Sequence, residues 1–284
     1  MKNKILPLLV LPFMLSSCMT SFNYQFNKDI SYGEYKERNL FDIAFPKKKR
    51  ETSLIVYIHG GAWVAGSKDK MVKSFLKKYN DEYIYSAINY RYASEEYHCN
   101  DILDDIQNAM LKIRDFSSSK GYQINKVAFF GHSAGGHLSL LYGYKMKEVC
   151  PFDIGFVSSL SGPTDLTDEN YLTSTILKDS YYTLMSYMTG MTINETNFKD
   201  NEEELLKWSP ITYVSKACPT IICHGDIDDV VPFSNAETLD KALSNSGVMH
   251  DFFIYNDSGH GLDNTKSVDD LYQQRFKEYK ELYL

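Results

Sequence analysis

The sequence predicts an α/β fold with a mostly parallel central sheet, helices on both faces and a small helical cap. Three observations support this prediction. Apolar, β-branched runs typical of buried strands alternate along the chain with amphipathic helical segments. Such alternation is typical of parallel sheets whose crossover helices cover both faces. Residues 163–208 are polar, rich in Tyr and Met and without a clear strand, so we expect an inserted cap over one edge of the sheet.

The predicted strands are short apolar runs, and the helices between them show apolar residues at helical spacing. The strands are expected at Thr52–His59, Tyr83–Tyr90, Lys126–Gly131, Ile154–Leu160, Thr220–Gly225 and His250–Asn256. The helices are expected at residues 68–79, 101–116, 134–146, 234–243 and 267–283. With no internal repeat and no low-complexity linker, residues 51–284 are predicted to form one domain that carries the cap.

Length and composition indicate a globular protein with a substantial core. The chain has 284 residues, of which 43% are hydrophobic and 14% aromatic, which argues against a disordered chain. The net charge is -7, and the longest cationic run is the KKKR of Lys47–Arg50, which we expect to be a solvated loop. No basic footprint for nucleic acid is present, so this class of partner is excluded.

The first 17 residues resemble a bacterial lipoprotein signal. Lys2 and Lys4 precede an apolar stretch, Ile5–Leu15, that is too short to span a bilayer easily and ends in LSSC. The resemblance implies that residues 1–17 are a signal peptide and that Cys18 becomes the lipidated N-terminus. Residues 18–50 would then form a tether and an edge segment of an exported protein anchored to a membrane. An ordinary secretory signal with a chance cysteine is the alternative, and a cytosolic protein with an apolar N-terminus the weakest one.

The other cysteines give no metal-binding pattern. Cys99, Cys150, Cys218 and Cys223 form no CxxC pair, so we expect no metal site. In an exported protein these residues could form disulfides, but the pairing cannot be read from the sequence. Cys218 and Cys223 flank or lie within an apolar strand and are expected in the core.

The segment GHSAGG, residues 131–136, fits the G-x-S-x-G turn that presents a nucleophilic serine. It follows a predicted strand and opens a predicted helix. Neighbouring chain passes very close to such a turn, so only glycine fits at positions 131 and 135. The strained turn lifts the Ser133 hydroxyl above the sheet, and the helix beginning at Ala134 points its N–H groups at the same place. A Gly-rich turn that cradles phosphate is the alternative, but it does not need a central serine.

Serine needs a base, and His260 is the expected one. It lies in the loop SGHG, just after the last predicted strand, where a side chain can reach over the serine. Gly259 and Gly261 are expected to let this loop bend tightly. The remaining histidines lie too early in the chain or inside other elements: His59, His98, His132, His137, His224 and His250.

The loop HGGAW, residues 59–63, is expected to form an oxyanion hole. Glycines after a buried strand let backbone N–H groups turn toward developing negative charge. We expect Gly61 and Ala62 to donate from this loop and Ala134 from the start of the helix. His59 is expected to hydrogen-bond the loop into shape, and Trp63 to be a pocket wall or core residue.

The motifs HGGAW, YRYASE, GHSAGG, HGDIDDVVP and SGHG occur in the order seen in the α/β-hydrolase superfamily. The sequence resembles its hormone-sensitive-lipase-like and BD-FAE-type esterases, and the kynurenine formamidases that share HGGxW, over about residues 50–284. The resemblance implies the α/β-hydrolase fold and a Ser-His-Asp acyl hydrolase that needs no metal or organic cofactor. Ser94 replaces the proline of the related YRLxPE pattern, which puts the local turn in doubt but not catalysis.

The third catalytic residue is expected among the aspartates of HGDIDDVVP. The loop after Gly225 should face the loop of His260, because the two preceding strands are expected to be neighbours. Asp226 is expected to serve the turn, and Asp229 to cap the next helix or remain solvated. Asp228 lies three residues past Gly225 and matches the acid of the family pattern, so it is our choice. Asp229 is the next candidate, followed by Asp257 and Asp263.

These residues predict a serine carboxylesterase acting on small acyl or acetyl esters, possibly on glycans. An amidase, peptidase or formamidase on the same fold is the alternative, which comparison of ester and amide substrates would separate. A non-catalytic binding protein is the third hypothesis, and labelling by a fluorophosphonate would exclude it. The acyl and alcohol groups depend on the cap, and the oligomeric state is not indicated.

Overall fold

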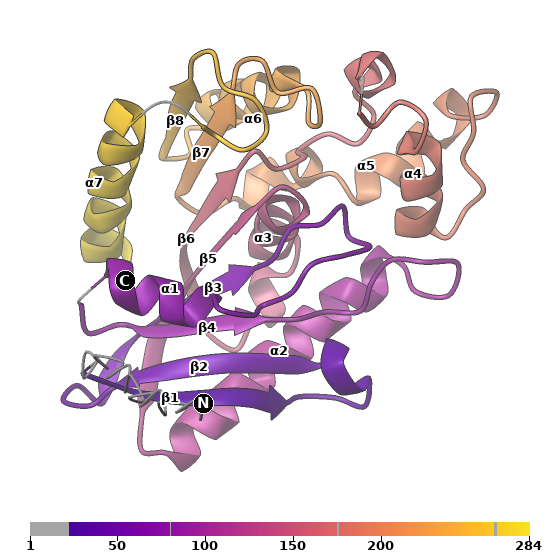
Figure 1. The fold of residues 1–284 in the computed structure, drawn as a ribbon. Helices are drawn as coiled ribbons and strands as arrows, with labels where there is room; N and C mark the ends of the chain where they lie inside the picture. The colour runs from indigo at the N-terminus through magenta and orange to yellow at the C-terminus, as the bar shows by residue number, and fades with distance from the viewer. Residues whose placement is uncertain (1–22, 80, 175, 264–265) are drawn as a thin grey trace, which may run out of the picture.

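The computed structural model describes residues 23–79, 81–174, 176–263 and 266–284. These residues form one sheet of eight strands in the order β1-β2-β4-β3-β5-β6-β7-β8 (Figure 1). Strands β3 to β8 are parallel to their neighbours, whereas β2 is antiparallel to β4 and β1 antiparallel to β2. The predicted α/β fold with a mostly parallel sheet is therefore confirmed.

The elements follow the predicted alternation. The strands are β1 (Tyr24–Ser31), β2 (Leu40–Pro46), β3 (Glu51–Ile58), β4 (Ile84–Ile88), β5 (Gln123–His132), β6 (Asp153–Leu160), β7 (Thr220–Gly225) and β8 (His250–Tyr255). The α-helices are α1 (Met71–Lys78), α2 (Cys99–Ser119), α3 (Ala134–Lys145), α4 (Tyr181–Thr189), α5 (Glu202–Lys207), α6 (Phe233–Asn245) and α7 (Lys266–Tyr283). Short 3-10 helices lie at Lys36–Arg38, Lys147–Val149, Glu169–Thr173, Lys199–Asn201 and Pro210–Lys216.

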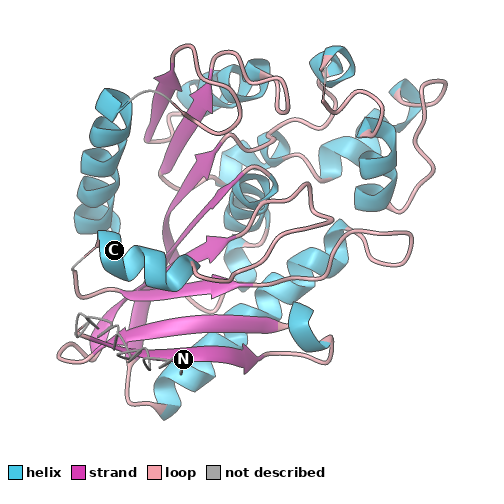
Figure 2. Cartoon of the chain, in the orientation of Figure 1, coloured by secondary structure: helices cyan, strands magenta, loops and turns pink. Residues whose placement is uncertain are grey.

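Helices cover both faces of the sheet (Figures 1 and 2). Helices α1 and α7 pack on one face, where Phe75 and Phe276 belong to one buried cluster. Helices α2, α3 and α6 cover the other face, where Ile106, Leu138 and Leu239 belong to a second cluster. Since full burial of such a side chain contributes about 1.5–3 kcal/mol, these two layers supply the main stabilising term for the sheet.

The N-terminal strands lie in the segment that we predicted as tether and edge segment. β2 pairs with β1 on one side and β4 on the other, and Phe41, Ile43 and Phe45 are completely buried. The sheet therefore begins at Tyr24, and the domain boundary predicted at residue 51 is too late. The alternation of Phe41, Ile43 and Phe45 was visible in the sequence, but a strand between two others can be recognised only from its pairing.

Cys18 and the remainder of residues 1–22 lie outside the described residues. In the part of the chain that the structure describes, no helix has the length and apolar character needed to cross a membrane.

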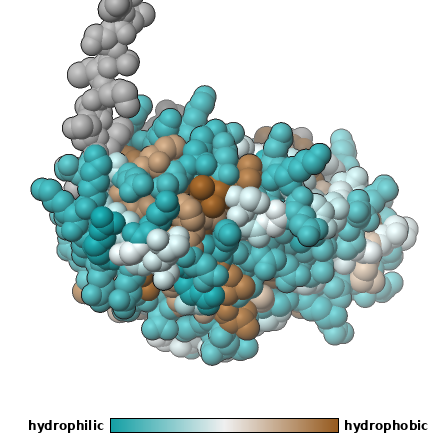
Figure 3. Space-filling view, turned by 90° about the horizontal axis from the view of Figure 1, so that it is seen from below, coloured by the Kyte–Doolittle hydropathy of each residue, from teal (hydrophilic) through white to brown (hydrophobic). Residues whose placement is uncertain are grey.

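Lys47–Arg50 are all exposed, as expected of a solvated loop. The face of the molecule drawn in Figure 3 is mainly polar, with small apolar areas. Cys99, Cys150, Cys218 and Cys223 are free thiols in the structure.

The segment 163–208 contains α4, α5 and two of the 3-10 helices, and its described residues contain no strand (Figure 2). A buried amide joins it to α6. Asn235 accepts hydrogen bonds from the backbone N–H groups of Thr164 and Asp165 at 2.8 and 3.0 Å, and donates to Asp168 at 2.8 Å. Because Asn235 is completely buried, these bonds fix the start of the cap against the main body.

The turn at Ser94 forms without the proline of related sequences. The Ser94 hydroxyl accepts the N–H groups of Glu96 and Tyr97 at 3.1 Å each, and the Ser94 N–H donates to the Tyr97 carbonyl at 2.8 Å. Serine favours this kind of local side-chain turn. The substitution therefore leaves an ordered loop.

Candidate active site

Ser133 lies in a strained turn between β5 and α3. Its φ and ψ angles are 57° and -127°, in a region that costs a residue other than glycine about 1–3 kcal/mol. A Cβ atom at Gly135 would lie 2.0 Å from the Ile58 carbonyl oxygen, and one at Gly131 would lie 2.5 Å from the Gly135 oxygen. Glycine is thus required at both positions, for the steric reason that the GHSAGG spacing suggested.

The loop after β3 passes directly against Ser133. A Cβ atom at Gly60 would lie 2.6 Å from the His132 carbonyl oxygen and 3.3 Å from the Ser133 Cβ. Gly61, Ala62 and Trp63 follow with positive φ angles of 115°, 49° and 63°. Such a run turns successive N–H groups in unusual directions and suits an anion-binding concavity.

Two of the three predicted oxyanion donors line the pocket of Ser133. Ala62 and Ala134 line the same pocket as Ser133, and Gly61 directly precedes Ala62. Among the described residues, no hydrogen bond uses the backbone N–H of Gly61 or Ala62. Ala134 is the first residue of α3, where a backbone N–H has no acceptor within the helix. These N–H groups can therefore serve a substrate oxygen.

His59 shapes this loop. Its Nδ1 donates to the Gly60 carbonyl oxygen at 2.8 Å, and its ring stacks on Tyr90 with the centroids 4.2 Å apart. Burial lowers the pKa of His59 to about 4, so the imidazole is neutral at pH 7. The contacts are those of a structural histidine, as expected from the sequence.

The loops after β7 and β8 bring an acid and a base together, since these strands are parallel neighbours. His260 Nδ1 donates to Asp228 Oδ2 at 2.8 Å. Asp228 Oδ1 accepts the backbone N–H groups of Val230 and Val231, each at 2.9 Å. The carboxylate is completely buried, whereas 19% of the His260 side chain is exposed. Of the three clustered aspartates, only Asp228 is buried.

The surroundings keep Asp228 ionised. Burial alone would raise the pKa of the Asp228 carboxyl, but hydrogen bonds from His224, His260 and the Val231 N–H hold it well below its usual range. An ionised carboxylate fixes the proton of His260 on Nδ1 and leaves Nε2 as the basic nitrogen. The loop bends at the flanking glycines, where the Leu262 N–H donates to the Gly259 carbonyl at 3.2 Å, although neither Gly259 nor Gly261 has a positive φ angle.

Two further histidines contact the acid–base pair, and the sequence reasoning assigned no role to either. His132 Nε2 lies 2.7 Å from the His260 carbonyl oxygen, and the two rings lie 4.8 Å apart. His224 Nε2 lies 2.9 Å from the Val231 carbonyl oxygen and 3.2 Å from Asp228 Oδ2. One indication of the contact between His224 and Asp228 was visible in the sequence, where His224 precedes Asp228 by only four residues.

The loop of His260 is held against the turn of Ser133 through His132, which directly precedes the serine. No hydrogen bond joins the described side chains of Ser133 and His260 in the structure. Bonds between a catalytic serine and its base are often long in free enzymes and shorten with substrate. The turn of Ser133, His260 and the buried Asp228 therefore lie together at the carboxyl ends of the parallel strands.

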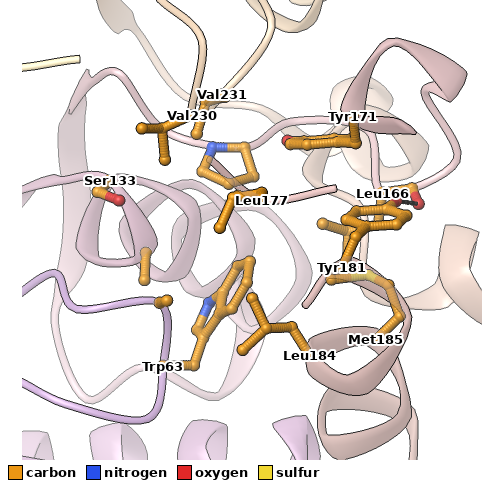
Figure 4. Close-up of a pocket in the computed structure, with 13 residues that line it drawn as sticks. Trp63, Ser133, Leu166, Tyr171, Leu177, Tyr181, Leu184, Met185, Val230 and Val231 are labelled. Carbon is orange, nitrogen blue, oxygen red and sulfur yellow. Dashed lines mark hydrogen bonds between the residues drawn. The ribbon is translucent and has the colours of Figure 1, made fainter. Parts of the chain in front are cut away.

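A small apolar pocket of about 30 Å³ opens beside Ser133 (Figure 4). Ser133 lies at one side, and Tyr171, Tyr181 and Met185 lie at the opposite side. The full lining comprises Ala62, Trp63, Ser133, Ala134, Pro163, Leu166, Tyr171, Leu177, Tyr181, Leu184, Met185, Val230 and Val231. Since a buried site of about 10–15 Å³ holds one water, this space suits a short acyl group.

Buried hydrogen bonds hold the pocket wall. The Trp63 Nε1 donates to His137 Nδ1 at 3.1 Å, and His137 Nε2 donates to the Trp208 carbonyl oxygen at 2.7 Å. His137 is completely buried, and burial lowers its pKa to about 4. Trp63 thus forms a pocket wall, as the sequence suggested. This link joins the oxyanion loop, α3 and the end of the cap.

Two stacked tyrosines form the end of the pocket. The rings of Tyr171 and Tyr181 are 4.8 Å apart and nearly parallel. Both hydroxyls are bonded away from the pocket, that of Tyr171 to Asn235 Oδ1 at 3.1 Å and that of Tyr181 to the Leu166 carbonyl. Because the hydroxyls have partners, the tyrosines present apolar ring surface to a ligand.

Metal binding finds no support in the described part of the chain. There, no three histidine, cysteine or carboxylate side chains are placed to share a metal ion. The chemistry of a serine, a histidine and an aspartate requires none.

Comparison with known proteins identifies relatives of this chain. The BD-FAE family model matches residues 41–243, and the dienelactone hydrolase family model matches residues 208–281. The probable carboxylic ester hydrolase LipM of Mycobacterium tuberculosis is 28% identical over 75% of this chain and 51% of its own length. The probable isoprenylcysteine α-carbonyl methylesterase ICME of Oryza sativa subsp. japonica is 22% identical over 84% of this chain and 59% of its own length. The chain thus spans little more than half of these relatives.

Solved structures share the fold. A truncated carbohydrate esterase from gut microbiota superposes with a TM-score of 0.73 at 20% identity, covering 92% of this chain and 98% of that one. Esterase B from Lactobacillus rhamnosis gives a TM-score of 0.74 at 14% identity, covering 92% of this chain and 86% of that one.

Proposed function

Because the chain belongs to the BD-FAE family, we propose that it is a serine hydrolase that cleaves carboxylic esters through an acyl-enzyme. The hydrogen bond of 2.8 Å between His260 Nδ1 and the buried Asp228 carboxylate carries this proposal. It leaves the second nitrogen of His260 basic, in a loop held against the strained turn of Ser133. The esterase names of relatives such as LipM agree with it.

In the proposed reaction, Ser133 Oγ attacks the ester carbonyl while His260 Nε2 accepts the hydroxyl proton. The oxyanion of the tetrahedral intermediate accepts hydrogen bonds from the N–H groups of Gly61, Ala62 and Ala134. Collapse expels the alcohol, which receives the proton from His260. Water then repeats the sequence on the acyl-enzyme, with His260 again as base, and releases the acid. No cofactor takes part.

The acyl group is proposed to be short and the alcohol to be a sugar. The pocket beside Ser133 is small and apolar, so it suits an acetyl or similar group better than a long acyl chain. The fold neighbour titled a carbohydrate esterase supports a glycan as the alcohol. An acetylated carbohydrate therefore satisfies both observations.

A substrate screen with the purified chain tests this function. Acetylated sugars, feruloyl esters, short and long fatty-acyl esters and amide analogues are compared, with Ser133→Ala as the control. We expect short acyl esters to be cleaved fastest and Ser133→Ala to lose at least about 10⁴-fold in kcat. Turnover that survives in Ser133→Ala would contradict the mechanism, and faster cleavage of amides would favour the amidase alternative.

We also propose that Cys18 is lipidated and holds the protein at a membrane of the cell envelope. The LSSC pattern supports this proposal. Tyr24 pairs with Pro46, and β2 runs antiparallel to β4, so residue 23 lies at the end of the sheet opposite Ser133. If the domain is held by this end of the sheet, the pocket faces away from the membrane, toward soluble or wall-bound substrates. Loss of palmitate incorporation and release from membranes in Cys18→Ser is expected; unchanged labelling would contradict the anchor.

A further inference from the structure

His224 contacts the acid of the site at the same carboxylate oxygen as the base. It lies in β7 and its side chain is 1% exposed, while the Asp228 carboxylate that it faces is completely buried. His224 Nε2 lies 3.2 Å from Asp228 Oδ2, the same oxygen that accepts His260 Nδ1 at 2.8 Å. Two imidazoles therefore share one carboxylate oxygen.

The tautomer of His224 follows from its second contact. His224 Nε2 also lies 2.9 Å from the Val231 carbonyl oxygen, which can only accept a hydrogen bond. The proton of His224 is therefore on Nε2, where it bonds the Val231 oxygen and lies beside Asp228 Oδ2. His224 thus presents a hydrogen to the acid and not a lone pair.

The donors to Asp228 divide between its two oxygens. The N–H groups of Val230 and Val231 bond Oδ1, whereas His260 bonds Oδ2 and His224 Nε2 approaches the same oxygen to 3.2 Å. Without His224, Oδ2 would keep a single partner in a buried site, so the carboxylate could rotate toward Val230 and Val231. Buried polar groups that lose a partner lose their fixed geometry.

We infer that His224 is a positioning residue, which holds Asp228 so that the carboxylate orients His260 toward Ser133. This inference rests on the proposed function, but the geometry also makes a prediction about His260 that does not require a substrate. His132, which bonds the His260 carbonyl oxygen at 2.7 Å, and Tyr171, whose charge state would be felt by Asp228, are further titratable side chains near the pair. His132 holds the backbone of His260 and does not contact Asp228, so it cannot replace His224.

His224→Gln and His224→Met provide a matched pair of variants. Their side chains have similar length and volume, but only glutamine can donate an N–H to Asp228. His250→Gln is the remote control, because His250 contacts Asp240 and the Val248 carbonyl at the start of β8. Thermal unfolding of each variant gives the folded fraction to which all rates are normalised.

We expect kcat for a short p-nitrophenyl ester to fall about 10- to 100-fold in His224→Met, with KM nearly unchanged, and only a few-fold in His224→Gln. The acidic limb of the profile of kcat/KM against pH should move to higher pH in His224→Met. Removing His224 leaves the negative charge of the Asp228 carboxylate less compensated, and this charge stabilises the protonated form of the neighbouring imidazole. A purely structural role would lower kcat/KM by the same factor at every pH and would leave the acidic limb at the same pH.

The proton NMR signal of the His260 Nδ1–H completes the test, because this proton lies in the hydrogen bond to Asp228. A change or loss of this signal in His224→Met, but not in His224→Gln or His250→Gln, supports the inference even if no ester is turned over. Absence of turnover in the unmodified protein would instead overturn the proposed function. Equal kcat, equal acidic limbs and equal His260 Nδ1–H signals in His224→Met and His224→Gln would overturn the positioning role.

Discussion

Different kinds of contact stabilise two regions of the molecule. One is the set of loops at the carboxyl ends of β3, β5, β7 and β8, which we call the edge, and the other is the cap of residues 163–208. At the edge, backbone packs directly on backbone: a single carbon added at Gly135 would meet the Ile58 oxygen at 2.0 Å. In the cap, side chains make the contacts, through the stacked Tyr171 and Tyr181 and the buried amide of Asn235. The positions where backbone meets backbone therefore tolerate no added side chain, whereas the cap can change its pocket by exchanging side chains.

The largest effect is expected from the acid at the edge. Asp228→Asn should lower kcat by about 10⁴-fold, because the amide no longer holds His260 in the required tautomer. Asp229→Asn is the matched control, since Asp229 is exposed, and kcat should change less than about threefold. Steady-state kinetics on one ester measures both. Full activity in Asp228→Asn together with loss in Asp229→Asn would reverse the assignment.

The protein should also become less stable in acid, because of one histidine in the edge, His59, and one in α3, His137. His59 and His137 have pKa values lowered to about 4 by burial, so they stay neutral in the folded protein while unfolded histidines bind protons below about pH 6.5. The unfolded state then binds more protons, and the free energy of unfolding falls as the pH decreases from about 6.5 to 4. At pH 4, each histidine lowers the free energy of unfolding by roughly 3 kcal/mol relative to its value above pH 6.5.

Urea unfolding at several pH values measures this slope. A free energy of unfolding that is constant between pH 6.5 and 4 would show that the two histidines are accessible to protons in the folded protein. The cap contributes no histidine to this effect, because residues 163–208 contain none.

A single methyl group at the edge should destabilise the protein by about 3 kcal/mol. Gly135→Ala forces Cβ against the Ile58 backbone, and neither chain can move without disturbing β3 or the turn of Ser133. Gly259→Ala is the control, because its added Cβ would meet nothing within 4 Å. Differential scanning calorimetry of both variants compares the two; an equal melting temperature would mean that the edge is less rigid than these contacts indicate.

The motifs predicted the edge because its geometry depends on residue types at fixed spacing. GHSAGG and HGGAW require glycine for steric reasons, and Asp228 and His260 follow adjacent parallel strands, so their proximity follows from the topology. His224 and His132 escaped notice because their roles depend on where their ring nitrogens point. β2 was missed because its buried position comes from pairing with β1 and β4. The shape of the cap depends on side-chain packing, which the sequence pattern does not specify.

The smallest effect is expected in the cap, where Leu184→Ala should enlarge the pocket. The ratio of kcat/KM for a butyryl over an acetyl ester should rise about tenfold, since each methylene in an apolar pocket is worth about 1–3 kcal/mol. Thr183→Ala on the same helix is the control, because Thr183 is exposed and does not line the pocket. An unchanged ratio in Leu184→Ala would place the acyl group elsewhere.

The central claim is that the edge makes Ser133 a nucleophile. Labelling with a fluorophosphonate, followed by peptide mass spectrometry, tests it most directly, because the reagent reacts only with an activated serine. We predict one adduct on the peptide containing Ser133, formed at least about 10³-fold more slowly in His260→Ala. Absence of an adduct, or an adduct on another residue at an unchanged rate in His260→Ala, would contradict the account.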